Sequence, residues 1–432
     1  MAQDDRYARL AHGMATMADQ RWTRRRFLRV TGLGSVAFLA ACAARSVTKP
    51  TSSAVPSASA TPFTSATPSP PPAATPSPAP TPTATPMPDL RARIGQMLLV
   101  GFRGLTVDDR SPIVQDIRDR GLGGVVLFDF DTPTNTPVRN VQSPGQVKAL
   151  VAALKAAAGG ADSLLVSIDE EGGLVARLDQ RHGFPATESA AALGARDDPA
   201  YTQQRSAAMG ATLASVGVNL NLAPVVDLNV NPSNPIIGAL DRSFSADPSV
   251  VTRQALAFIA GQHQAGIQTT LKHFPGHGSS TGDTHLGVVD VTSTWTDAEL
   301  EPFASIVTQG AADAILTAHV FNANLDPSYP ATLSKATVTG ILRERLGFDG
   351  VVISDDLQMG AIRQAFGYPE AVALAIEAGV DILTIANQQV FEDGIVAATI
   401  EIIVGHVASG RLTESRIDES WRRIALLKGR MR

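Results

Sequence analysis

Short apolar runs rich in β-branched residues recur along the second part of the chain, and alanine-rich segments of helical length separate them. Seven runs are clear, and polar residues stand at or just after their ends. They are Gly123–Phe128, Leu164–Asp169, Val218–Asp227, Thr269–Phe274, Ala314–His319, Val351–Asp355 and Asp381–Ala386. The run Met97–Phe102 is a weaker eighth candidate. The pattern predicts strands that alternate with helices.

Nearly continuous apolar strands separated by helices are typical of a parallel sheet covered on both faces. Seven or eight such units within residues 89–432 fit a (β/α)8 TIM-like barrel, so we expect an α/β fold in one folded domain. A doubly wound open sheet is the alternative, but no glycine-rich dinucleotide fingerprint follows the first strand. The last segment, Val390–Arg432, has a helical pattern and should cover the side of the barrel.

Ionisable residues stand at or just beyond the C-terminal ends of five predicted strands. They are Asp169, Asp227, the pair Lys272-His273, His319 and Asp355. In a barrel these ends converge on one face, where active sites are built. A single charged strand end is usually a cap or a loop anchor, but five of them predict a shared polar pocket.

The first 42 residues have the pattern of an export signal. Thr23–Arg29 (TRRRFLR) resembles the twin-arginine motif, and the apolar run Val30–Ala41 is too short to span a bilayer, which takes about 20 residues. The run leads into Leu39-Ala40-Ala41-Cys42, which resembles a bacterial lipobox and would make Cys42 the lipidated first residue. The alternative is a basic tail followed by a chance apolar run.

Residues 43–88 are rich in Pro, Ser, Thr and Ala and predict a disordered, extended linker, with an O-glycosylated stalk as a compatible alternative.

Charge and cysteine content narrow the functional classes. The net charge is −5, so no basic face for nucleic acid is expected, and the single cysteine, Cys42, excludes intrachain disulfides and a cysteine-rich zinc site. Without residues 1–41 the net charge becomes −9. We therefore expect membrane association through a lipid anchor only.

The stretch Leu271–His285, LKHFPGHGSSTGDTH, holds three of the eight histidines. A zinc site could form from His273, His277 and His285 on a loop, although Pro275 and its neighbouring glycines disfavour the helix that usually presents such ligands. The histidines could also be plain structural residues. A third interpretation starts from Asp283 and His285, which lie two residues apart. A carboxylate that holds one ring nitrogen fixes the tautomer and leaves the other nitrogen as a general acid/base.

Asp355, at the end of the predicted strand Val351–Asp355, is the candidate nucleophile for this acid/base. The alternative is that Ser354 or an aspartate caps a helix beginning near Leu357. We expect Asp356 to make that cap, which would leave Asp355 for chemistry.

Together, KHFPGHGSSTGDTH and GFDGVVISDDLQM resemble signature segments of glycoside hydrolase family 3, more narrowly its bacterial β-N-acetylglucosaminidase (β-hexosaminidase) branch. The resemblance covers most of residues 93–385 in the same order. It includes the segments Asp169–Gly173 with Arg177, Leu222–Asp227 and Asp241–Phe244.

The resemblance implies a role for each matching residue. Asp355 would be the nucleophile, His285 the general acid/base on a mobile loop, and Asp283 the residue that orients it. The terminal sugar would be held by Asp169, Arg177, Arg242, Lys272 and His273. Two departures from the family pattern are Glu170, where Gln is usual, and Leu174, where Arg is usual. Both are expected beside the sugar pocket, which puts the preference for the leaving group in doubt.

The resemblance therefore implies a retaining exo-β-N-acetylglucosaminidase that acts on peptidoglycan fragments or chitooligosaccharides, without a cofactor or metal. We expect a monomer, exported and lipid-anchored on the outer face of the cytoplasmic membrane or in the cell envelope. Within the family, a β-glucosidase, a β-xylosidase or a glycoside phosphorylase is the alternative. A non-catalytic sugar-binding lipoprotein and a metal-dependent hydrolase are alternatives of other classes.

Overall fold

The computed structural model describes residues 87–160 and 163–431. The predicted export signal with Cys42, and all but the last two residues of the predicted linker, lie outside the described residues. No helix in the described ranges is long and apolar enough to cross a bilayer.

Eight parallel strands form the centre of the folded part. They are β1 (Leu98–Gly101), β2 (Gly124–Leu127), β3 (Leu165–Ile168), β6 (Leu220–Asn221), β7 (Gln268–Phe274), β9 (Ala314–Thr317), β11 (Val351–Ile353) and β12 (Leu383–Ile385). Their order is β11-β9-β7-β6-β3-β2-β1-β12, and a parallel bridge between Ile353 and Ile382 joins the two outer strands. The ring confirms the predicted barrel and excludes the open doubly wound sheet.

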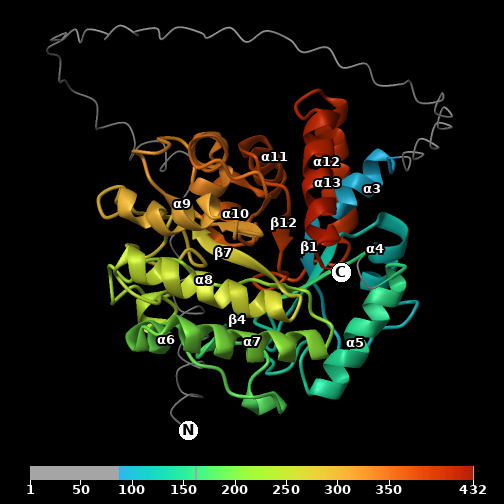
Figure 1. Cartoon of the computed structure of the whole chain (residues 1–432). Coiled ribbons are helices and arrows are strands. Elements are labelled where there is room, and N and C mark those ends of the chain that lie inside the picture. The colour runs from blue at the N-terminus through green and yellow to red at the C-terminus, as the bar shows by residue number, and fades with distance from the viewer. Residues whose placement is uncertain (1–86, 161–162, 432) are drawn as a thin grey trace, which may run out of the picture. The chain divides into compact units, whose positions relative to one another are not determined.

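Helices follow the strands around the barrel (Figure 1). The α-helices are α3 (Leu90–Gln96), α4 (Pro112–Arg120), α5 (Pro144–Ala157), α6 (Ala190–Arg196), α7 (Pro199–Ser215), α8 (Pro248–Gln264), α9 (Glu301–Thr308), α10 (Gly360–Phe366), α11 (Tyr368–Ala378), α12 (Ile395–Ala408) and α13 (Glu414–Gly429), and η6 (Ala336–Arg345) is a π-helix. Local signals in the sequence start several of them. Asp198 and Asp247, for example, accept hydrogen bonds from the first turns of α7 and α8, which both carry Pro at the first position.

The strands are buried on both faces, as their continuous apolar pattern requires. Every residue of β1, β2 and β3 is buried, and so is every residue of β7. The apolar core extends from the barrel interior to the layer between strands and helices. This rigid frame fixes the position of each strand end.

One strand is much shorter than its apolar run predicted. Regular pairing covers Leu220–Asn221 instead of Val218–Asp227, and afterwards only an isolated bridge joins Val225 to Lys272. Pro224 lies within the run, and because proline has no N–H it cannot donate to a sheet ladder. The chain continues along β7 as irregular backbone and still brings Asp227 to the face where the strands end.

The C-terminal segment is helical, as predicted. In α13, Ile417, Ile424 and Leu427 are buried. The ammonium of Lys428, near the end of α13, donates to Gln96 Oε1 at 2.7 Å, to the Gly123 carbonyl at 2.9 Å and to the Ser163 carbonyl at 2.7 Å. Gly123 and Ser163 precede β2 and β3, so α13 reaches the N-terminal end of the barrel, opposite the polar strand ends.

Candidate active site

The structure brings the polar strand ends together at the C-terminal face of the barrel. Asp169 follows β3 directly, and Lys272 and His273 lie within β7. The ammonium of Lys272 contacts Asp169 Oδ1 at 2.6 Å, across 103 residues of sequence. The predicted convergence of Asp169, Lys272 and His273 on one face is therefore observed.

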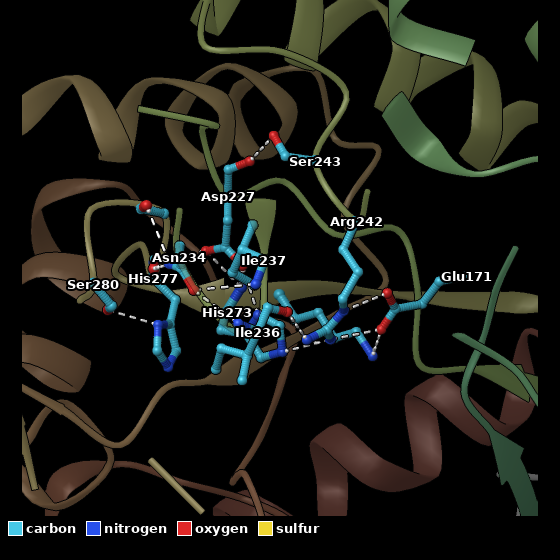
Figure 2. A network of polar contacts seen from close by, with 12 residues as sticks. Glu171, Asp227, Asn234, Ile236, Ile237, Arg242, Ser243, His273, His277 and Ser280 are labelled. Atoms are coloured by element: carbon cyan, nitrogen blue, oxygen red, sulfur yellow. Dashed lines mark hydrogen bonds and ion pairs between the residues drawn. The ribbon is translucent and has the colours of Figure 1, made fainter. Parts of the chain in front are cut away.

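Glu171, a buried carboxylate that the sequence analysis did not single out, contacts two cations of the site, Arg242 and Lys272. Figure 2 shows its contact with Arg242. Arg242 donates from Nε and Nη2 to both oxygens of Glu171 at 2.7 Å, and Lys272 Nζ lies 2.6 Å from Glu171 Oε1. Burial would raise the pKa of Glu171, but the charges of Arg242 and Lys272 outweigh burial and hold that pKa below its usual range. The two cations are therefore held in place by a carboxylate that stays charged.

Asp227 is fully buried and holds the backbone and ring of His273 (Figure 2). Its Oδ2 lies 2.6 Å from His273 Nδ1, and its Oδ1 accepts from the His277 amide at 2.7 Å. The other ring nitrogen of His273 lies 3.3 Å from Arg242 Nη2. Asp227 was predicted to be at this face, and the structure adds that it fixes the orientation of His273.

Arg177 and Asp129 extend the polar group towards β2. Arg177 lies 3.8 Å from Asp169 Oδ2 and 3.6 Å from Asp129 Oδ1, measured from its guanidinium nitrogens. Asp129 was missed by the sequence analysis, although it follows the run Gly123–Phe128 in the way that Asp169 follows its own run. A polar residue just after an apolar run is therefore the sequence signal for Asp129 as well.

Asp355 lies just beyond β11, where its Oδ1 accepts from the Asp356 amide at 2.8 Å. Burial would raise the pKa of Asp355, but three nearby histidines outweigh burial and lower it. They are His319, His273 and His285. The carboxyl group is thus kept ionised, which is the state that a nucleophile needs.

The expectation that Asp356 caps the next helix is wrong. Its Oδ1 accepts from the amides of Gln358 at 3.1 Å and Ala386 at 3.0 Å, so it ties the β11 loop to the end of β12. Helix α10 starts at Gly360 rather than near Leu357, and its N-cap residue Met359 makes no side-chain cap. The sequence pattern could not show this because the acceptor for a helix amide can come from a distant segment.

The predicted contact between Asp283 and His285 is confirmed. His285 Nδ1 lies 2.6 Å from Asp283 Oδ1, which also accepts the His285 amide at 2.8 Å. Partial burial would lower the pKa of His285, but the bond to Asp283 and the charges of Asp283 and Asp355 outweigh it and raise that pKa. The His285 side chain is 41% exposed. Since Nδ1 is held by Asp283, Nε2 is the nitrogen that can exchange a proton with a ligand.

His277 belongs to the frame of the site. Its Nδ1 lies 2.7 Å from Ser280 Oγ and its Nε2 lies 3.3 Å from Thr284 Oγ1, while Asn234 donates to its carbonyl at 2.7 Å (Figure 2). Burial lowers the pKa of His277 to about 4, so the ring is neutral. In the part of the chain that the structure describes, no group of three or more His, Cys, Asp or Glu side chains could hold a metal ion. The arrangement therefore gives no support to a zinc site built from His273, His277 and His285.

The two departures from the expected motif lie in the hairpin of β4 (Glu170–Gly172) and β5 (Val175–Ala176). Glu170 is buried, and its Oε2 accepts from the Leu178 amide at 2.9 Å. Its carboxyl group is therefore engaged in supporting the hairpin, and its neighbour Glu171 is the one that meets the cations of the site. Leu174 lies in the turn between the two strands.

Comparisons with known proteins agree with this geometry. Residues 89–427 match the model of the glycosyl hydrolase family 3 N-terminal domain. A β-hexosaminidase from Xylella fastidiosa strain M23 is 39% identical over 308 residues, which cover 70% of this chain and 86% of that protein.

Solved structures give the same result. A family 3 β-N-acetylglucosaminidase from Paenibacillus sp. FPU-7 superposes with a TM-score of 0.71 at 35% identity and covers 80% of this chain. This chain spans 63% of that longer protein. A β-N-acetylhexosaminidase from Beutenbergia cavernae is 32% identical with a TM-score of 0.71, covering 79% of this chain and 99% of that one. The barrel, the family match and these relatives lead to one conclusion: the chain is a glycoside hydrolase and belongs to glycosyl hydrolase family 3.

Proposed function

We propose that the protein is a retaining exo-β-N-acetylglucosaminidase that releases terminal N-acetylglucosamine from peptidoglycan fragments or chitooligosaccharides. The observation that carries the proposal is that Asp355, just beyond β11, and the hydrogen-bonded Asp283–His285 dyad lie at one face of the barrel, where the charge of each shifts the pKa of the other. The names of the relatives, β-hexosaminidase and β-N-acetylglucosaminidase, support the choice of sugar.

In this proposal the reaction takes two steps. Asp355 attacks the anomeric carbon while His285 Nε2 gives its proton to the leaving oxygen, so the glycosidic bond breaks as a glycosyl–aspartate ester forms. His285 then takes a proton from water, and the resulting attack on the ester releases the sugar and restores the Asp355 carboxylate. Two inversions at the same carbon retain its configuration.

The raised pKa of His285 suits this sequence of events. A histidine that is protonated near neutral pH can act first as the acid and, once it is neutral, as the base. It also leaves a neutral ring, rather than a second carboxylate, beside the nucleophile. The charges of Asp283 and Asp355 favour the protonated ring before the reaction begins.

We propose that Asp169, Arg177, Arg242, Lys272 and His273 bind the sugar, with unequal shares of direct contact. The side chains of Asp169 and Arg177 are 19% and 21% exposed, so their polar atoms can reach hydroxyl groups. The Lys272 side chain is only 3% exposed and is held between Asp169 and Glu171. Lys272 therefore acts mainly by fixing Asp169.

The test is hydrolysis of 4-nitrophenyl N-acetyl-β-glucosaminide by the full chain, beside the matching β-glucoside. Asp355→Asn and a chelator-treated sample run in parallel, in phosphate and in a non-phosphate buffer. We expect turnover of the acetamido sugar alone, insensitive to chelator and phosphate, and lost in Asp355→Asn. Equal turnover of the glucoside would overturn the substrate assignment. Dependence on phosphate would indicate a phosphorylase, and silence on both sugars would favour a binding protein.

We also propose export and lipid anchoring through Cys42, supported by the twin-arginine pattern and the lipobox of the sequence. Two acyl chains hold a protein on a bilayer far more firmly than one. In a bacterial host fed an alkyne-labelled fatty acid, the full chain should take up label and sediment with membranes, whereas Cys42→Ser should do neither. A Cys42→Ser protein that still carries label and sediments would contradict the assignment.

A further inference from the structure

The segment that carries His285 docks on the helix that follows the nucleophile. Helix α10 begins at Gly360, five residues after Asp355, and its cap residue offers no side-chain acceptor. Backbone oxygens of the dyad segment take that place. The Gly360 amide donates to the His285 carbonyl at 3.2 Å, and the Ala361 amide donates to the Thr284 carbonyl at 3.2 Å.

These two bonds are the main polar fastening of the segment. Within the described chain, one side-chain hydrogen bond connects the segment between Thr281 and Val288 to a residue outside it. It joins Thr284 Oγ1 to His277 Nε2 at 3.3 Å. Leu286 is 38% exposed, so apolar burial there contributes little. The position of His285 therefore depends on backbone contact with α10.

That contact requires a residue without a side chain at position 360. A Cβ atom on Gly360 would lie 2.8 Å from the His285 carbonyl oxygen and 3.0 Å from the Leu286 carbonyl carbon. Both are backbone atoms, so they cannot rotate aside as the third neighbour, the amide end of Gln364 at 3.0 Å, could. Gly360 does not have a positive φ, so close approach of the loop is the reason for glycine at this position.

We propose that Gly360 is the positioning residue of the acid/base. Its bare Cα lets the 283–286 backbone dock on the first amides of α10, which sets His285 at its working distance from Asp355. The inference rests on the proposed role of His285 as the proton donor. Gly360 itself touches neither substrate nor the reacting atoms.

The role predicts a selective defect in Gly360→Ala. A leaving group of low pKa departs without a proton, whereas a sugar leaving group needs one. A displaced His285 therefore slows formation of the glycosyl–aspartate ester, the step that kcat/KM reports, only for the second kind. For chitobiose we expect kcat/KM to fall roughly 100-fold, the loss that a misplacement of about 1 Å can cause. For the 2,4-dinitrophenyl glycoside, kcat/KM should change less than about fivefold, because general acid catalysis is not needed there. With chitobiose, kcat/KM of the variant should also fall less steeply as pH rises, because proton donation by His285 contributes less to the rate.

Gly287→Ala is the matched control, because it lies on the same loop and a Cβ there meets no atom within 4 Å. It should leave both substrates unchanged. Gly360→Ala should fold, because Gly360 does not have the positive φ that strains alanine and its close backbone neighbours lie only in the loop, and thermal unfolding checks this.

His285→Ala distinguishes a failure of the positioning role of Gly360 from a failure of the proposed function. If it shows the same selectivity for the sugar leaving group and Gly360→Ala does too, the inference stands. If His285→Ala is selective but Gly360→Ala is unaffected, or loses both substrates equally, the positioning role is wrong and the proposed function survives. If His285→Ala shows no selectivity, or the parent chain hydrolyses neither substrate, the proposed function fails and the inference falls with it.

Discussion

Among the carboxylates near His285, Asp283 has the largest effect on the charge of the ring. Asp283 raises the pKa of His285 against the effect of burial, through a 2.6 Å contact to Nδ1. In the proposed mechanism the enzyme is active while His285 is protonated, so the basic limb of kcat/KM against pH reports that pKa.

Asp283→Asn should therefore move the basic limb of kcat/KM to lower pH. The amide keeps the shape of the side chain but removes the charge that raises the pKa of His285. With a sugar leaving group we expect kcat/KM at pH 7 to fall by about 100-fold, within the usual range for general acid–base catalysis. Initial rates between pH 4 and 9 give the measurement. A basic limb that stays in place would show that another group controls it.

Glu171 is the residue on which two buried cations depend. In Glu171→Gln, Arg242 and Lys272 lose the carboxylate that lies 2.6–2.7 Å from each. Breaking a buried ion pair by removing one partner typically lowers the free energy of unfolding by about 3 kcal/mol. Denaturant titration of the variant measures this loss, with Asp349→Ala as the control.

Asp349 pairs with Arg423 at 3.0 Å, but its side chain is 91% exposed. Exposed ion pairs contribute about 0–1 kcal/mol, so the free energy of unfolding of Asp349→Ala should be close to that of the parent chain. If Glu171→Gln and Asp349→Ala lost similar amounts of unfolding free energy, the buried ion pairs of Glu171 would contribute no more to stability than an exposed pair.

Glu170 links stability to pH in the opposite sense from a paired carboxylate. Burial raises the pKa of Glu170 to about 8 from an ordinary value of 4.5. Between these two values the folded state binds more protons than the unfolded state, so this residue makes stability fall as pH rises. Glu170→Gln should match the parent near pH 4 and be more stable near pH 8, by an amount on the order of 1–3 kcal/mol.

Denaturant titrations at the two pH values test this prediction for Glu170. Glu301→Gln, an exposed position on α9, is the control and should show no such difference between the two pH values. A Glu170→Gln chain whose stability follows the parent at both pH values would mean that the carboxyl group is ionised throughout.

At the scale of the elements, the apolar runs predicted all eight barrel strands because each is long enough and buried on both faces. The boundaries failed where a local rule competed with the run, as at Pro224 in the segment after β6. The start of α10 could not be predicted, since its caps are carbonyls of residues 284 and 285, more than 70 positions earlier. Glu171 was missed for the same reason: its partners Arg242 and Lys272 meet it only in the folded barrel.

Helix α13 should be indispensable to the barrel although it lies far from the chemistry. It buries Ile417, Ile424 and Leu427, and full burial of such side chains contributes about 1.5–3 kcal/mol each. A chain ending at Leu412 would lose an amount comparable to the whole stability of a typical domain, about 5–15 kcal/mol. We expect it to lack a cooperative thermal transition by circular dichroism. A chain lacking only Met431 and Arg432 is the control, and a cooperative transition in the shorter chain would contradict the prediction.

At the scale of the whole molecule, the sequence predicted that the strands form one barrel and that their polar ends share a face. It could not predict how the ring closes, because closure depends on contacts between β11 and β12 rather than on either strand alone. The backbone bridge between them joins Ile353 to Ile382. Beyond it, the amides of Thr384 and Ala386 donate to Ser354 Oγ at 2.9 Å and Asp356 Oδ1 at 3.0 Å.

The two side chains that flank the nucleophile thus add to the closure of the barrel, beside backbone bonds such as that from the Ser354 amide to the Ile382 carbonyl at 2.8 Å. A substitution of Ser354 or Asp356 that is meant to alter the surroundings of Asp355 also removes a hydrogen bond that closes the barrel. The arc of β2 and β3, away from the seam, is held by a continuous backbone ladder and places Asp129 and Asp169 at its rim. Redesign for a different sugar therefore has more freedom on that arc. At the seam, a substitution beside Asp355 affects both the nucleophile and the closure of the barrel.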